Sequence, residues 1–148
     1  MKPVDKNITL DTSITVKWFD LKETNAEMAI RILRLLQNKE INIHQPQLAK
    51  YELGNVLIKG KNFELSKTLK ALNFYHSLSI NFIPENIESS QNTAQTAYKL
   101  NITYYDASFI TVAKKYSATL ITENPKHQKQ IYGVKIKTLK QFFNEAKK

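Results

Sequence analysis

Short β-prone runs alternate with helix-like segments along almost the whole chain, and this alternation constrains the fold more than any other feature of the sequence. The strand-like runs are residues 8–10, 41–43, 80–83, 119–122 and 134–136. Apolar side chains at helical spacing predict helices over 26–38, 46–59, 64–78, 86–99, 104–116 and 139–146, with a further short helix up to Tyr132. Such alternation is typical of a parallel sheet with helices on both faces. The sequence therefore predicts an α/β fold, a three-layer α/β/α sandwich around a central, mainly parallel sheet.

Local signals refine three of these helices. The segment 24–27 has the form of a capping box that opens the first long helix. Pro46 suits the first turn of the next helix. In the helix over 64–78, we expect Leu65, Leu69 and Leu72 to face inward.

Length and composition predict one domain that spans residues 1–148, without internal repeats. The absence of cysteine excludes a disulfide scaffold, a thiolate zinc site and a cysteine nucleophile. The N-terminus lacks the apolar core of a signal peptide, and no run of about 18 apolar residues exists to span a membrane. We therefore expect a soluble, cytoplasmic protein with no membrane partner.

The chain carries a formal net charge of +9. A charge of this sign favours binding to polyanions through counterion release, which makes a nucleic acid a candidate partner. A surface that is merely rich in lysine is an equally good explanation of the charge alone.

Acidic residues follow several of the predicted strands. Asp11 ends the first strand, Asp106 opens a helix, and Glu123 and Asn124 follow the run 119–122. In parallel α/β folds the ligand site lies outside the carboxyl ends of the strands. Together with Glu52, on the predicted helix 46–59, these side chains are therefore candidates for a single site at that edge.

Apolar neighbours predict that Asp11, Glu52 and Asp106 are each partly buried. Partly buried carboxylates that lie close together repel unless a cation neutralises them, and Mg²⁺ or Mn²⁺ prefers such oxygen ligands. Such a metal can activate water and stabilise a phosphoryl transition state. Taken singly, Asp11 or Asp106 could instead cap a helix, and Glu52 could be a solvated helix residue.

Three polar side chains have supporting positions. Ser13 and Thr122 lie beside the acidic residues and could orient a metal-bound water, although local hydrogen bonds to the backbone are an equally good explanation. Asn55 follows Glu52 by about one helical turn and could orient its carboxylate.

The segments LDTSITVKWF, YELGNVLIK and YYDASFITVAKKYSATLIT appear in this order. Together they resemble the PIN-domain nucleases, especially the VapC-like toxins of prokaryotic toxin–antitoxin pairs, over nearly the whole chain. The resemblance implies a PIN-like sandwich and a ribonuclease that depends on Mg²⁺ or Mn²⁺, with Asp11, Glu52 and Asp106 around the metal. It also implies products with 5′-phosphate and 3′-hydroxyl ends, a homodimer, and a cognate antitoxin across the active-site groove.

The chain departs from this family at Asn124, where an aspartate is usual. Glu123 could replace it only if the backbone is redirected, because neighbouring side chains on an extended strand point to opposite faces. We therefore expect one well-held metal ion and weakened binding of a second.

Other side chains are candidates for contact with RNA. The candidates for phosphate binding are Lys114, Lys126, His127 and Lys129. The candidates for base stacking are Trp18, Phe19, Tyr104 and Tyr105, with core packing as the alternative.

Two other classes of protein are alternatives. A catalytically weakened PIN domain that binds RNA or protein is left open by Asn124. A haloacid-dehalogenase-type phosphatase would need a second aspartate at the position of Ser13.

Overall fold

The central sheet joins segments from both halves of the chain. The structure is a computed structural model that describes residues 5–124 and 133–146. In these residues five strands form a sheet of order β3-β2-β1-β4-β5, in which every neighbouring pair is parallel. The strands are β1 (Asn7–Leu10), β2 (Asn42–Pro46), β3 (Asn81–Ile83), β4 (Thr119–Ile121) and β5 (Ile136–Lys137).

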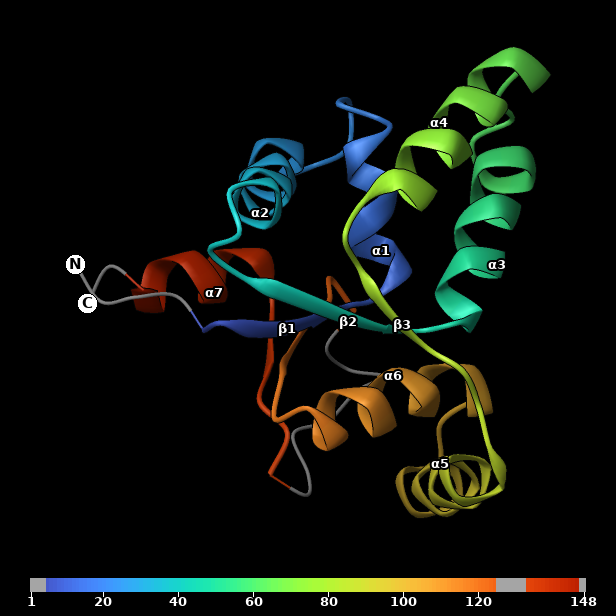
Figure 1. Cartoon of the computed structure of the whole chain (residues 1–148), viewed down its shortest axis with the longest axis vertical. Coiled ribbons are helices and arrows are strands. Elements are labelled where there is room, and N and C mark those ends of the chain that lie inside the picture. Colours follow the sequence, from blue (N-terminus) through green and yellow to red (C-terminus); the bar gives the residue numbers. More distant parts are fainter. Residues whose placement is uncertain (1–4, 125–132, 147–148) are drawn as a thin grey trace.

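Helices cover both faces of the sheet (Figure 1). One face carries α1 (Thr12–Thr15), the short η1 (Val16–Trp18), α2 (Ala26–Gln37), α3 (Leu48–Asn55), α4 (Leu65–Ser77) and α7 (Leu139–Ala146). The helix α3 continues directly into the π turn η2 (Val56–Gly60). The other face carries α5 (Ile87–Leu100) and α6 (Tyr104–Lys115). This arrangement confirms the predicted α/β/α sandwich.

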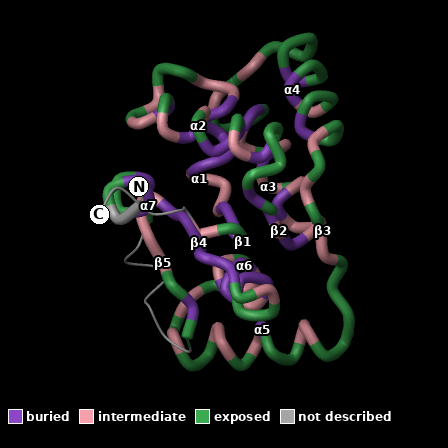
Figure 2. The backbone as a smooth tube through the Cα atoms, turned by 60° about the vertical axis from the view of Figure 1, so that its left-hand side comes forward, coloured by how far each residue is buried: buried purple, intermediate pink, exposed green. Residues whose placement is uncertain are grey.

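A separate apolar cluster fills the space on each side of the sheet. Ile8, Leu10 and Ile121 belong to the cluster beneath α2 and α7, whereas Leu120 belongs to the cluster beneath α6. Neighbouring residues of a strand point to opposite faces, so β4 contributes to both clusters. Figure 2 shows the buried residues along the strands and the inner faces of the helices. This packing fixes where each strand ends, and so where the residues after it lie.

The predicted capping box at the start of α2 is wrong. The helix begins at Ala26, and Asn25 precedes it in the left-handed conformation, without a side-chain cap. The backbone carbonyl of Thr24 instead accepts a hydrogen bond of 2.6 Å from the buried Lys17 ammonium. The contact with Lys17 holds the loop in a path that the local sequence did not indicate.

Two other local predictions are also wrong. Pro46 is the last residue of β2, and α3 begins only at Leu48. On α4, Leu65 and Leu69 are exposed, and only Leu72 of the predicted trio packs against the core. The buried face of α4 consists of Thr68, Ala71 and Tyr75.

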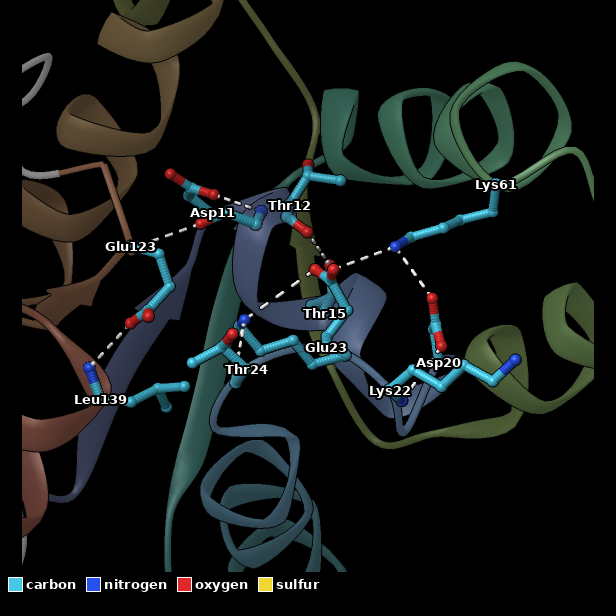
Figure 3. Close-up of polar contacts among 12 residues, drawn as sticks. Asp11, Thr12, Thr15, Asp20, Lys22, Glu23, Thr24, Lys61, Glu123 and Leu139 are labelled. Carbon is cyan, nitrogen blue, oxygen red and sulfur yellow. Dashed lines mark hydrogen bonds and ion pairs between the residues drawn. The ribbon is translucent and has the colours of Figure 1, made fainter.

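A cluster of charged residues joins η2 to the loop before α2. The Lys61 ammonium lies 2.9 Å from Asp20 Oδ2 and 3.0 Å from Glu23 Oε2, as Figure 3 shows. Both carboxylates therefore hold the end of the α3–η2 helix against the segment that follows α1. The helix predicted up to Tyr132 lies outside the described residues. No helix in the described parts of the chain is long and apolar enough to span a membrane.

Candidate active site at the carboxyl edge of the sheet

A buried glutamine fixes the end of β1. The Gln45 side chain accepts a hydrogen bond of 2.8 Å from the Leu10 amide and donates one of 2.8 Å to the Leu10 carbonyl. On the other side of β1, the Asp11 amide donates to the Ile121 carbonyl over 3.1 Å. Leu10 is therefore held from both sides, and Asp11 leaves the sheet at a defined point. Sequence reasoning missed Gln45, because the predicted strand ended at residue 43, whereas β2 continues to Pro46.

The Asp11 carboxylate receives two short hydrogen bonds. Its Oδ1 accepts from the Ser13 amide at 2.5 Å, which makes Asp11 the N-cap of α1. Its Oδ2 accepts from the Thr122 hydroxyl at 2.5 Å, and that hydroxyl accepts from the Asn124 amide at 3.0 Å. The capping alternative is therefore correct for Asp11. Because a carboxylate has about four lone-pair positions, the same group can still bind a cation.

Glu52 lies on α3 and faces the start of α1. Its Oε1 accepts a hydrogen bond of 2.7 Å from the Thr12 hydroxyl, a partner that sequence reasoning also missed. Burial raises the pKa of Glu52 above 4.5, and the negative charges of Asp11 and Asp106 raise it further, against the opposing effect of the Thr12 bond. The three carboxylates therefore act on one another electrostatically, and Glu52 is not a freely solvated residue.

Asp106 occupies the first turn of α6. The Thr103 hydroxyl accepts a hydrogen bond of 3.0 Å from the Asp106 amide, so Thr103 is the N-cap of this helix. The alternative in which Asp106 caps the helix is therefore wrong. Thr103 fixes the turn that brings the half-buried Asp106 to the same edge as Asp11 and Glu52.

Glu123 is turned away from the three carboxylates. Its Oε1 accepts a hydrogen bond of 3.2 Å from the Leu139 amide at the start of α7, as Figure 3 shows. Its own amide donates to the Ser13 hydroxyl over 3.1 Å. Asn124 is exposed directly after it, and Asn55 is exposed in the last turn of α3. Ser13 and Thr122 therefore organise the backbone and carboxylates of this edge.

Among the described residues, the other candidate RNA contacts lie in different surroundings. Lys114 lies near the end of α6, eight residues or about 12 Å of helix from Asp106. Trp18 is buried and donates its indole N–H to the Ala29 carbonyl at 2.8 Å, and Phe19 packs against the same core. Tyr104 and Tyr105 are exposed. Lys126, His127 and Lys129 lie outside the described residues.

The donor set suits a hard divalent cation in its chemistry. Asp11, Glu52 and Asp106 offer carboxylate oxygens at one edge. Burial is the main cause that raises the pKa of Glu52, and a bound cation would offset the smaller contribution from the charges of Asp11 and Asp106. Within the described ranges, no three side chains of the metal-binding acidic, histidine or cysteine types form a ready metal-binding group. Side-chain rotation, chiefly of the long Glu52, would therefore have to accompany metal binding.

The fold and site define a class: α/β sandwiches with acidic side chains from three elements at the carboxyl edge of a parallel sheet. The model of the PIN domain family matches residues 8–133. This chain belongs to the PIN domain family. A comparison with curated proteins gives no match.

Solved structures share the fold at low sequence identity. VapBC2 from Rickettsia felis, bound to a DNA fragment from its promoter, matches 89% of this chain and 98% of its own, with a TM-score of 0.68 and 18% identity. A toxin–antitoxin complex from Klebsiella pneumoniae matches 86% and 94%, with a TM-score of 0.61 and 20% identity. VapC20 of Mycobacterium tuberculosis, a toxin that cleaves the sarcin–ricin loop, matches 76% and 85%, with a TM-score of 0.62 and 14% identity.

Proposed function

We propose that this chain is a divalent-metal-dependent endoribonuclease that acts as the toxin of a type II toxin–antitoxin pair. The observation that carries the proposal is a PIN fold in which Asp11 follows β1, Glu52 on α3 is bonded to Thr12, and Asp106 lies in the first turn of α6. A cluster of carboxylates that repel one another is stable as a group only when a cation or a proton neutralises part of its charge. Mg²⁺ or Mn²⁺ is the cation that carboxylate oxygens favour.

Asp11 and Glu52 have distinct positions in this proposal. Asp11 is the most rigid metal ligand, because the Ser13 amide and the Thr122 hydroxyl fix both of its oxygens. Glu52, held by Thr12 and carried on the longest of the three side chains, would be a second metal ligand. A bound metal ion would supply Lewis-acid stabilisation of the phosphoryl group and an activated water.

The similar solved structures support the biological part of the proposal. One of them is a toxin–antitoxin complex, and another is a toxin that cleaves an RNA loop. The net charge of +9 favours a polyanionic substrate. We propose that the protein forms a homodimer and that a cognate antitoxin inhibits it, in the cytoplasm where both RNA and antitoxin occur.

Asn124 leads us to propose a single tight metal site. Asn124 has no charge, and the Glu123 carboxylate is engaged at the start of α7. A calorimetric titration with Mn²⁺ should give one tight site per chain. Two tight sites would contradict this part of the proposal.

The second candidate function is a catalytically weakened PIN domain that binds RNA or a protein. Asn124 and Glu123 favour this second function. Asn124 has no charge and Glu123 is turned toward α7, so neither adds a fourth carboxylate to Asp11, Glu52 and Asp106. The test incubates purified protein and structured RNA with Mn²⁺. It compares Asp11→Asn with a matched surface variant, Glu27→Gln, which changes an exposed residue of α2. We expect the parent and Glu27→Gln to cleave, and Asp11→Asn to leave the RNA intact. An inactive parent, or equal cleavage by Asp11→Asn, would support the binding module instead.

A further inference from the structure

A cavity is lined by Tyr51 and Tyr105, the residues that directly precede two of the three carboxylates. It has a volume of about 290 Å³ and lies between the start of α3, the end of β3 and the first turns of α6. Figure 1 shows the starts of α3 and α6 on either side of the sheet where β2 and β3 end. Its apolar and aromatic walls include Pro46, Tyr51, Ile83, Tyr104, Tyr105 and Val112.

Three tyrosines at this cavity are accessible to solvent. Tyr51 is 75% exposed, Tyr105 59% and Tyr104 39%. The Tyr104 hydroxyl donates a hydrogen bond to Glu85, which fixes its ring at the wall. Accessible rings that line a cavity offer flat surfaces for stacking, in contrast to Trp18 and Phe109, which pack inside the core.

The threonine and serine hydroxyl groups that line the cavity already have protein partners. Thr93 donates to the Thr111 hydroxyl at 2.9 Å, Thr111 donates to the Ala107 carbonyl at 3.0 Å, and Ser108 donates to the Tyr105 carbonyl at 2.6 Å. The cavity therefore offers few hydrogen-bond donors to a ligand. Such walls suit a flat heterocycle better than a phosphate or another strongly charged group.

The cavity is continuous in the chain with the candidate active site. Tyr51 directly precedes Glu52, and Tyr105 directly precedes Asp106, so each pair of Cα atoms is about 3.8 Å apart. We propose that the cavity is a subsite for one unpaired nucleobase of the RNA, next to the phosphate that is cleaved. This inference rests on the proposed ribonuclease function, because a phosphate at the carboxylates would carry its base to this cavity.

The proposal predicts a preference for single-stranded RNA. A base paired in a helix must first break its pair and leave its stack to enter a cavity, whereas a base in a loop or single strand avoids most of this cost. The alternative occupant is a partner peptide that fills the cavity with an apolar side chain. In that case, substitutions in the cavity walls would not change RNA binding.

The test measures the binding of a fluorescently labelled single-stranded RNA of about 12 nucleotides by anisotropy. Ca²⁺ replaces Mn²⁺ to hold the RNA without relying on cleavage. The variants are Tyr51→Ala and Tyr105→Ala, with Tyr51→Phe to retain the ring. The matched control is Tyr98→Ala, which removes a tyrosine that is 90% exposed on α5 and does not line the cavity.

We expect Tyr51→Ala and Tyr105→Ala each to weaken binding by about 5- to 150-fold, the range for loss of one base–aromatic stack. Tyr51→Phe and Tyr98→Ala should bind like the parent. Every variant should bind an abasic ribose-phosphate oligomer of the same length with the same affinity as the parent. Circular dichroism verifies that each variant is folded.

The outcomes separate this inference from the proposed function. If Tyr51→Ala and Tyr105→Ala bind RNA as Tyr98→Ala does, or the parent does not bind the RNA, the subsite is wrong. If those variants then also cleave RNA like the parent, the ribonuclease proposal stands without the subsite. If the parent binds bases at the tyrosines and does not cleave with Mn²⁺, the subsite stands and the ribonuclease proposal falls.

Discussion

Gln45 replaces a section of the backbone ladder between β1 and β2 with its own side chain. Beyond the pair Ile8 and Ile43, the Gln45 amide group bonds both polar groups of Leu10. Because Gln45 is fully buried, water cannot take over these bonds. The position of Asp11 therefore depends on a residue 35 positions further along the chain than Leu10.

Replacing Gln45 tests this dependence. Gln45→Leu leaves the Leu10 amide and carbonyl without partners, and we expect it to lower the free energy of unfolding by about 1–3 kcal/mol. Urea denaturation measures the change. Gln37→Leu, on the exposed side of α2, is the control and should change stability by less than about 0.5 kcal/mol. Equal stability of Gln45→Leu and the parent would contradict the role of Gln45.

Glu52 makes the stability of the metal-free protein depend on pH. The pKa of Glu52 is raised above 4.5 in the folded state. At pH values between 4.5 and this raised pKa, the folded protein therefore binds more protons than the unfolded chain. The free energy of unfolding therefore falls as the pH rises through this window. Glu52→Gln removes the ionisation and can still accept the Thr12 bond. We expect the variant to melt at a higher temperature than the parent at pH 7.5, with a difference that disappears below pH 4.5.

Thermal melts in EDTA across this pH range make the measurement. Glu27→Gln on the surface of α2 is the control for the loss of one negative charge. A parent that is at least as stable as Glu52→Gln at pH 7.5 would show that burial and neighbouring charge do not act on Glu52 as described.

At the scale of single residues, the sequence pointed to the acidic trio but not to the residues that hold the trio in place. Asp11 and Asp106 were identified by their positions after a strand and in an opening helix, and Glu52 mainly by its motif. Thr12 and Gln45 escaped because their bonds join residues 40 and 35 positions apart, which depends on strand register and helix docking. Asn124 was recognised as a departure, whereas the engagement of Glu123 with α7 required the position of that helix.

The start of α6 is the element that brings Asp106 into the site. The Thr103 side chain caps this helix through the Asp106 amide. We expect Thr103→Ala to cost about 1 kcal/mol, or about 2–4 °C in melting temperature, and to reduce cleavage because the first turn frays. Thr103→Ser keeps the capping oxygen and should behave like the parent in both assays. A loss of activity in both variants alike would assign another role to the threonine methyl group.

Helix faces were harder to predict than helices. The leucines of α4 repeat at helical spacing, yet the face that packs inward carries Thr68, Ala71 and Tyr75. Periodicity alone shows that a helix has two faces, and does not show which face packs against the core. Similarly, Pro46 suits both a helix start and a strand end, and only pairing with Ile83 on β3 decides between them.

The whole molecule should respond to a divalent cation. Metal binding to the folded state alone stabilises it by about 2.7 kcal/mol at a free concentration one hundred times the dissociation constant. For a chain of this size that corresponds to a rise of about 5–11 °C in melting temperature. We expect Mn²⁺ to raise the melting temperature of the parent and of Glu27→Gln. A rise of equal size in Asp11→Asn would mean that the metal binds elsewhere.

The architecture of the whole molecule was predictable because its pattern is repeated. Each β-prone run followed by a helical segment gives the same information, so an error such as the start of α3 does not change the fold class. The strand order β3-β2-β1-β4-β5 was not predicted, because it depends on which crossovers the helices allow.

Three separate segments meet to form the candidate active site, and this has a consequence for synthesis of the protein. Asp11 leaves the ribosome early, but its partner Thr122 emerges 111 residues later. At about 5–20 residues per second, that interval lasts roughly 6–22 s. Throughout it the nascent chain lacks the strand that completes the edge beside Asp11. No activity that depends on this edge of the sheet can therefore begin before nearly the whole chain has been synthesised.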